Sequence, residues 1–160
     1  MEYPKRKPTR LKDYDYSQTG VYFVTVCTYK KQKLLSEIVG EGLCALPSVK
    51  LTEVGLIVDN YIKYIQNNLA GITVDNYIIM PNHIHLLVAI DNEATGGRGS
   101  PPLHNVIGRL KSYSTHAYGG RLWQRSFHDH IIRDESDYQK INEYIEYNAT
   151  KWNVDCFYVK

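Results

Sequence analysis

The chain has 160 residues, a mass of 18.5 kDa and a formal net charge of +2, with 43% hydrophobic and 22% charged residues. This length and this balance predict one globular domain that buries its own core, and they exclude a disordered or collagen-like chain. The longest apolar run, from Ile84 to Ile90, contains His85 and is far shorter than the roughly 20 residues that a membrane span needs.

The N-terminus and the cysteines favour a reducing compartment. Residues 1–7 carry several charges and no apolar stretch follows them, so we expect no secretory signal. Cys27, Cys44 and Cys156 are widely spaced and do not match the spacing of a zinc finger. We therefore expect a cytoplasmic protein without a membrane partner.

Basic side chains gather in two segments. Residues 1–12 hold five basic side chains against one acidic, and residues 98–133 hold six against one. In a chain so close to neutrality, this clustering indicates either an anionic partner or a basic tail with a solvated face. On the first interpretation, phosphate contacts come from Lys5, Arg6, Lys7, Arg109, Lys111 and Arg125.

The first half of the chain predicts an arm, a strand and a helix. Residues 1–18 are polar and have no hydrophobic period, so we expect a basic flexible arm that precedes a single domain over 19–160. The β-branched and aromatic run 21–28 predicts a strand. Residues 36–50 predict a loop or a short hairpin. Apolar side chains at helical spacing predict a helix over 51–69, with Thr52 as its N-cap.

The second half predicts three more strands and two more helices. Strands are expected over 72–80 and 83–90, joined by a turn at Pro81-Asn82, and a fourth within 122–132. A flexible loop is expected over 91–102 and a helix over 103–118, closed by two glycines. Ser136 and Gln139 match a capping box for a last helix over about 137–152.

The order of these elements predicts an α+β fold. Its central part, β-α-β-β-α-β, is the split unit of ferredoxin-like (RRM-like) folds. Such a fold packs its helices on one face of an antiparallel sheet and leaves the other face free to work. The last helix is an addition to that unit.

Two histidines stand out on the strand predicted over 83–90. His83 and His85 are two residues apart, which puts them on one face, about 6.6 Å apart along the strand. They are either ligands of one divalent cation or two solvent-facing side chains on an open sheet. We expect them on the face that packing does not require, because the opposite face is apolar throughout: Ile84, Leu86, Val88 and Ile90.

A tyrosine and an asparagine on the last helix complete a candidate site. Tyr144 and Asn148 are four residues apart and therefore lie one above the other at the edge of the apolar stripe. A cation held by two histidines and one amide or carboxylate oxygen can polarise a phosphate, and Asn148 can supply that oxygen. Helical geometry predicts that Tyr138 packs and that Tyr147 is solvated.

Three segments resemble a known family. Residues 80–87, Met-Pro-Asn-His-Ile-His-Leu-Leu, resemble the His-hydrophobic-His (HUH) motif of the single-tyrosine transposases. Residues 122–133 resemble the W-Q…D-H-x-I-R stretch of the REP-associated tyrosine transposases, and residues 144–148 resemble the family's Y-I-x-x-N segment. The similarity runs from about Gly20 to Trp152. One departure is Ala149, where relatives often have proline.

The resemblance implies a site and a reaction. Tyr144 would attack a single-stranded DNA phosphodiester, form a 5′-phosphotyrosine link and release a 3′-hydroxyl, and strand transfer would reverse the attack. His83, His85 and Asn148 would bind Mg²⁺ or Mn²⁺. The implied substrates are hairpins formed by palindromic repeats, and the family contains both homodimers and monomers.

Other interpretations use the same residues. His128 and His130 could join the first pair in a four-histidine zinc site, but we expect His130 to line the cleft and His128 to face away or outward. Trp123 is a candidate to stack on an unpaired base. The alternative function is a non-catalytic, single-stranded nucleic-acid-binding module of RRM-like fold. A two-histidine phosphoesterase is excluded, because no histidine has Ser or Thr two residues on.

Overall fold

A computed structural model describes residues 14–40, 46–96 and 98–157 of the chain. The basic side chains Lys5, Arg6 and Lys7 lie outside these residues, as do most of the predicted arm and Cys44. Within the described part, no helix is both long and apolar enough to cross a membrane.

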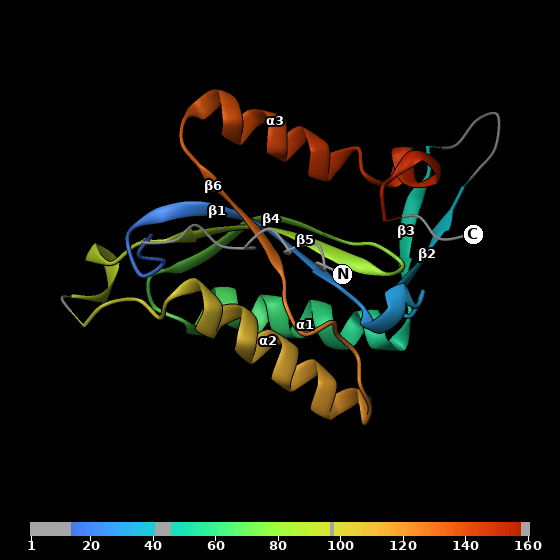
Figure 1. The fold of residues 1–160 in the computed structure, drawn as a ribbon, viewed down its shortest axis with the longest axis horizontal. Coiled ribbons are helices and arrows are strands. Elements are labelled where there is room, and N and C mark those ends of the chain that lie inside the picture. The colour runs from blue at the N-terminus through green and yellow to red at the C-terminus, as the bar shows by residue number, and fades with distance from the viewer. Residues whose placement is uncertain (1–13, 41–45, 97, 158–160) are drawn as a thin grey trace, which may run out of the picture.

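Four antiparallel strands form the central sheet in the order β4-β5-β1-β6. Helices α1 and α2 lie side by side against one face of it (Figure 1). This order and the alternation of strands with helices confirm the predicted α+β, ferredoxin-like arrangement. The elements are β1 (Gly20–Cys27), α1 (Glu53–Asn68), β4 (Ile72–Ile79), β5 (His83–Ile90), α2 (Leu103–Tyr118) and β6 (His128–Ile132).

Local sequence explains where most elements begin and end. The Thr52 hydroxyl accepts a hydrogen bond from the Gly55 amide and caps α1 as predicted. Helix α2 ends at Gly119, whose φ of 77° is the left-handed conformation that glycine adopts most readily. The predicted hairpin over 36–50 is present as β2 (Ser36–Val39) paired with β3 (Ser48–Leu51).

The last helix differs from its prediction at both ends. Helix α3 (Glu135–Glu146) begins earlier, because the Asp134 carboxylate, and not a Ser136–Gln139 box, accepts the Asp137 amide at 2.8 Å. The helix then gives way to the 3-10 turn η3 (Ala149–Val154), with Asn148 as its N-cap residue. Tyr144 therefore lies in the last turn of α3, and Asn148 lies just beyond it.

Helix α3 covers the sheet face opposite α1 and α2 (Figure 1). It is held to β4 by two polar contacts at a β-bulge: Tyr138 donates to Asp75, at 3.3 Å, and Asn76 donates to Asn142, at 2.7 Å. The expectation that this face stays free is therefore wrong. An added helix closes it.

Two segments expected to be flexible are anchored where they are described. Tyr14 and Tyr16 pack against the core, and the Leu103 amide donates to the Tyr16 carbonyl at 3.3 Å, so residues 14–18 belong to the domain. In the loop after β5, which contains the short turn η2 (Glu93–Thr95), Asn92 Nδ2 donates to the Ser17 carbonyl at 2.6 Å. A second short turn, η1 (Tyr29–Lys31), follows β1.

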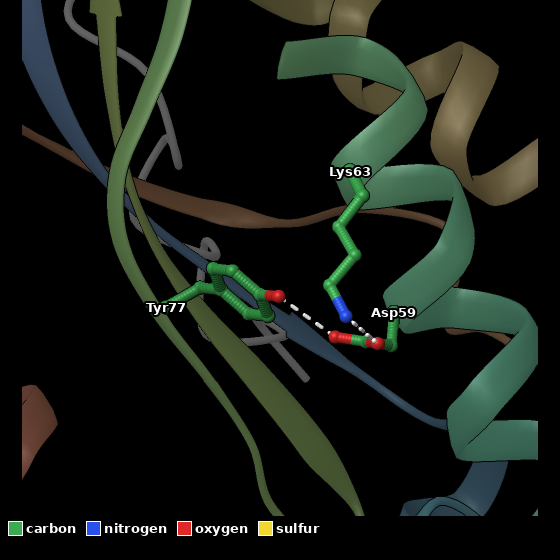
Figure 2. Close-up of polar contacts among 3 residues, drawn as sticks. All are labelled: Asp59, Lys63 and Tyr77. Carbon is green, nitrogen blue, oxygen red and sulfur yellow. Dashed lines mark hydrogen bonds and ion pairs between the residues drawn. The ribbon is translucent and has the colours of Figure 1, made fainter. Parts of the chain in front are cut away.

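A buried carboxylate joins α1 to the sheet (Figure 2). Asp59 is 9% exposed and accepts from the Tyr77 hydroxyl and from the Lys63 ammonium, both at 2.7 Å. Burial raises the pKa of Tyr77, and its bond to Asp59 raises it further, so the tyrosine stays protonated and remains a donor. The contact fixes which face of α1 is turned toward β4.

We expect Asp59→Ala to lower the free energy of unfolding by about 1–3 kcal/mol, because it leaves the Tyr77 hydroxyl without its acceptor. Lys63→Ala is the control: the Lys63 side chain is 58% exposed, so its loss should cost less than about 1 kcal/mol. Urea denaturation measures both. Equal losses would contradict a special role for the Tyr77 bond.

Candidate active site

The two histidines of β5 lie on the sheet face that α3 covers, since Tyr144 of α3 contacts the His85 ring. Thr25 is the cross-strand partner of His85, and Cys27 that of His83, so these four side chains share one face. His83 is 0% exposed and His85 1%. The same-face prediction is confirmed, but the expectation that packing does not require the pair is wrong.

Aromatic side chains seal the pair from water. The Phe157 ring lies 4.6 Å from the His83 ring between centroids, and the Trp152 ring lies 6.0 Å from it. Burial lowers the pKa of His83 to about 4 and holds the pKa of His85 well below its usual range. Both imidazoles are therefore neutral at pH 7, which is the form that binds a metal ion.

The hydrogen-bond pattern determines the tautomer of His83. The Asn82 amide nitrogen donates to the Phe157 carbonyl at 2.7 Å, which turns Asn82 Oδ1 toward His83 Nδ1 at 2.8 Å. That oxygen only accepts, so His83 Nδ1 carries the proton. His83 Nε2 is left with a free lone pair.

The partner of His85 allows either tautomer of its ring, unlike the partner of His83. Its Nδ1 lies 2.8 Å from the Thr25 hydroxyl, which can donate or accept. Its Nε2 lies 3.1 Å from His83 Nε2. Since His83 Nε2 bears a lone pair, His85 Nε2 donates its proton to it. If the ring changes tautomer, the Thr25 hydroxyl accepts from Nδ1 and both Nε2 atoms become free ligands.

A carboxylate joins the two histidines, and a buried amide is a second candidate oxygen donor. In the part of the chain that the structure describes, the group of side chains able to hold a metal ion is His83, His85 and Asp155, with ligand atoms all within 4.8 Å of one another. His128 and His130 are not in it, so the four-histidine site is not formed. Asn148, predicted as the third ligand, is 1% exposed, and its side-chain amide makes no hydrogen bond of good geometry, although it is near enough to the Tyr144 hydroxyl to lower its pKa. A buried amide whose hydrogen bonds are not satisfied is available as a ligand.

Tyr144 reaches this cluster from α3. Its hydroxyl lies 3.4 Å from His85 Nε2, and its ring packs edge-on against Phe23 and His85. Burial raises the pKa of Tyr144, the Asp155 carboxylate raises it further, and the Asn148 amide lowers it. The nucleophile predicted from sequence thus lies against the predicted histidine pair in one chain.

The neighbouring tyrosines of α3 differ from Tyr144 as predicted. Tyr147 is 56% exposed, as expected for a solvated side chain. Tyr138 is half-buried, with its hydroxyl on Asp75 of β4. Among the tyrosines of α3 and its C-cap, the described contacts bring Tyr144 to the histidines.

Two predicted DNA contacts have structural roles instead. Trp123 is 4% exposed and its indole donates to the Ser114 hydroxyl at 2.8 Å, so it belongs to the core, and the prediction that it stacks on a base is wrong. Lys111 donates to the Gln124 and Arg125 carbonyls at 2.6 and 3.0 Å. These bonds hold the segment that leads into β6, and a phosphate contact by Lys111 stays a prediction.

The remaining candidates lie away from the histidine pair. Arg109 is exposed on α2, on the other side of the sheet from Tyr144. Arg125 is exposed in the segment before β6. His130 is exposed and is bonded through Nε2 to the Asp137 carboxylate at 2.8 Å, so it does not join the cluster, and His128 is exposed as expected.

Comparison with known proteins identifies the fold. A REP-associated tyrosine transposase, solved bound to a REP hairpin, superposes with a TM-score of 0.65 at 21% identity, covering 89% of this chain and 73% of that one. An uncharacterized protein of Haemophilus influenzae is 29% identical over an alignment that covers 96% of this chain and 93% of that protein. No family model matches the chain. The chain therefore has the fold of a tyrosine transposase.

Sequence reasoning missed four residues of the site. Asn82 and Thr25 orient the histidine rings, Asp155 adds a carboxylate, and Phe157 covers the pair. Asn82 offered a signal in the sequence, because its side-chain oxygen, next to a histidine pair, can accept from a ring nitrogen. Thr25 and Asp155 are far from the pair in sequence, and only the β1–β5 register and the turn after α3 bring them there.

We expect Asn82→Ala to release the His83 tautomer and to weaken Mn²⁺ binding by about 10- to 100-fold, the usual effect of losing a ring-orienting partner. Long-range ¹H–¹⁵N NMR of the metal-free protein reports the tautomer, and Mn²⁺ titration by electron paramagnetic resonance reports affinity. Asn105→Ala, at an exposed position on α2, is the matched control. An Nε2-protonated His83 in the unaltered protein would refute the assignment.

Buried neutral histidines also make stability depend on pH. The pKa of His83 is about 4 in the folded state and near 6.5 when the chain is unfolded, so the unfolded chain binds protons first as pH falls. Stability should therefore be full above pH 6.5 and decline toward pH 4, by up to about 1.4 kcal/mol per pH unit for each histidine. Urea denaturation across this range should give a shallower decline for His83→Gln than for His104→Gln, an exposed control on α2. Equal slopes would argue against the buried neutral pair.

Proposed function

We propose that this chain is a tyrosine transposase that cuts and rejoins single-stranded DNA through a covalent link to Tyr144. The observation that carries the proposal is the Tyr144 hydroxyl, 3.4 Å from His85 Nε2 and beside two neutral, buried imidazoles. A non-catalytic nucleic-acid-binding module does not need a tyrosine hydroxyl next to two buried, neutral histidines. The transposase fold supports the same conclusion.

The side chains that would hold the metal ion are His83 and His85, with Asp155 and Asn148 as the oxygen donors. A bound Mg²⁺ or Mn²⁺ would neutralise charge on the scissile phosphate and orient it. Asn82 and Thr25 would keep the imidazoles aimed at the ion. The residues fit such an ion because the two Nε2 atoms face each other and the hydrogen bonds of the buried Asn148 amide are not satisfied.

The reaction balances with the tyrosine as the attacking group. Tyr144 Oη forms a bond to phosphorus as the bond from phosphorus to the 3′-oxygen breaks. The tyrosine loses its proton and the leaving 3′-oxygen gains one, so a free 3′-hydroxyl and a 5′-phosphotyrosine result. Attack by another 3′-hydroxyl reverses these bonds and transfers the strand. The raised pKa of Tyr144 keeps it protonated until a phosphate is bound.

The substrate class that we propose is hairpin DNA with an unpaired flank, by analogy with the REP hairpin bound by the structural relative. Exposed Arg125 and the basic residues Lys5, Arg6 and Lys7 would bind phosphates. Since His83 and His85 are at most 1% exposed, a covering side chain has to move before a phosphate reaches them, and Phe157, whose ring lies 4.6 Å from that of His83, is one candidate. A hollow of about 480 Å³ lies on the other side of Trp152 and is lined by Lys33, Glu37 and Pro81 among others; we propose that the strand approaches through it, although Glu37 would oppose a phosphate there.

One chain is sufficient for this site. Tyr144 contacts His85 of its own chain, so we propose that the nucleophile acts in cis. Formation of a homodimer stays a prediction, and it would not need to exchange α3 between copies.

The decisive experiment incubates the protein with labelled hairpin DNA and Mg²⁺ and separates covalent adducts on a denaturing gel. Tyr144→Phe should bind the hairpin with unchanged affinity and form no adduct, because only the attacking oxygen is removed. Tyr147→Phe, at an exposed position three residues away, should keep adduct formation.

Chelation of divalent ions should abolish the adduct, and adding Mg²⁺ or Mn²⁺ should restore it. An adduct that persists in Tyr144→Phe would move the nucleophile to another tyrosine. Tight binding without an adduct on any hairpin would favour the non-catalytic module.

A further inference from the structure

Three tyrosines stack on the outer surface of α1 and α2, on the side of the sheet away from Tyr144. The Tyr61 ring lies parallel to Tyr113, with centroids 4.3 Å apart and an interplanar angle of 18°. It also stacks on Tyr64, at 5.4 Å and 23°. These three residues are called the tyrosine cluster below.

The tyrosine cluster is open to solvent. Tyr64 is 51% exposed and Tyr113 50%, so about half the surface of each side chain is available to a ligand. With Asn60 they line a hollow of about 550 Å³. Exposed aromatic rings beside an amide offer both a stacking surface and a hydrogen-bonding group.

The charges around the tyrosine cluster suit an anion. Helix α2 contains no acidic residue, and it carries Arg109. Asp59 of α1 is turned toward the sheet and bonded to Tyr77 and Lys63, so it does not oppose an anion at this surface (Figure 2). Arg109 lies four residues before Tyr113 on α2, so the two side chains are neighbours on one face of the helix. In keeping with this position, Arg109 opposes the rise that burial causes in the pKa of Tyr61.

We propose that the tyrosine cluster is a second nucleic-acid site, which stacks unpaired bases on Tyr64 and Tyr113 while Arg109 binds the backbone phosphate. Aromatic rings bind bases of any sequence because every base has a π-face, and a neighbouring cation fixes the strand. The site lies across the sheet from the cluster of His83 and His85, so it would hold a different part of the strand from the one that is cut. It goes beyond the proposed cleavage and depends on it only for the class of ligand.

A binding experiment tests the proposal without catalysis. Fluorescence anisotropy with an oligothymidine in EDTA measures affinity, with the full chain carrying Tyr144→Phe throughout. Tyr113→Leu and Tyr64→Leu should each weaken binding about fivefold or more, equivalent to about 1 kcal/mol per stacked base. Tyr61 is left intact because it packs against the core. Tyr118→Leu, on the same helix and 38% exposed, should change nothing.

Photocrosslinking locates the strand directly. An oligonucleotide containing 5-iododeoxyuridine should crosslink to Tyr64 or Tyr113, as identified by mass spectrometry. A plot of log affinity against log salt has a negative slope, and Arg109→Gln should make that slope less steep by about 0.7, the value for one phosphate contact on a single strand.

The outcomes separate this site from the proposed cleavage. Unchanged affinity in both leucine variants, or crosslinks only elsewhere, would overturn the tyrosine cluster as a DNA site and leave Tyr144 untouched. Self-association in sedimentation that disappears in the leucine variants, with DNA affinity unchanged, would instead assign the surface to a second copy of the chain. If the leucine variants lose DNA affinity, and the protein with Tyr144 intact forms no covalent adduct, the tyrosine cluster would stand as a DNA site and the proposed cleavage would be rejected.

Discussion

Two neutral imidazoles buried between the sheet and α3 are the constraint on which the site depends. Burial makes the protonated form of each ring costly, so both rings stay neutral and every ring nitrogen needs a defined partner. Asn82 satisfies one ring and Thr25 the other, and the two remaining nitrogens face each other. The covering elements are therefore part of the site, because a solvated pair would have neither a fixed tautomer nor a lowered pKa.

The two faces of the sheet have different roles: one packs the hydrophobic core, and the other carries the candidate active site. One face is packed by α1 and α2 and is mostly apolar, with polar contacts such as those of Asp59 with Tyr77 and of Ser114 with Trp123. The other carries the histidines and is covered by α3 through amide and hydroxyl contacts at the β4 bulge. Tyr144 approaches the pair from the last turn of α3.

The aromatic and basic residues serve several roles, and type alone does not distinguish them. Trp123 fills the core and Lys111 holds backbone carbonyls, although both side chains are common in nucleic-acid interfaces. Tyr61, Tyr64 and Tyr113 stack on the outer surface of the helices. Burial separates these roles: a ring with 4% of its surface exposed cannot meet a base, whereas one with half its surface exposed can.

The sequence alone determined the β-α-β-β-α-β order, the common face of His83 and His85, and the position of Tyr144 relative to Tyr147, because each follows from local periodicity. It also located the Thr52 cap and the Gly119 stop of α2, which depend on local backbone geometry. Tertiary structure decided how α3 covers the second face, which residues orient the histidines, and that Asp155 joins them. Those contacts join residues that are far apart in the chain. The alternation of side chains along a strand shows on which face of the sheet a side chain lies, but it does not show which element packs against that face.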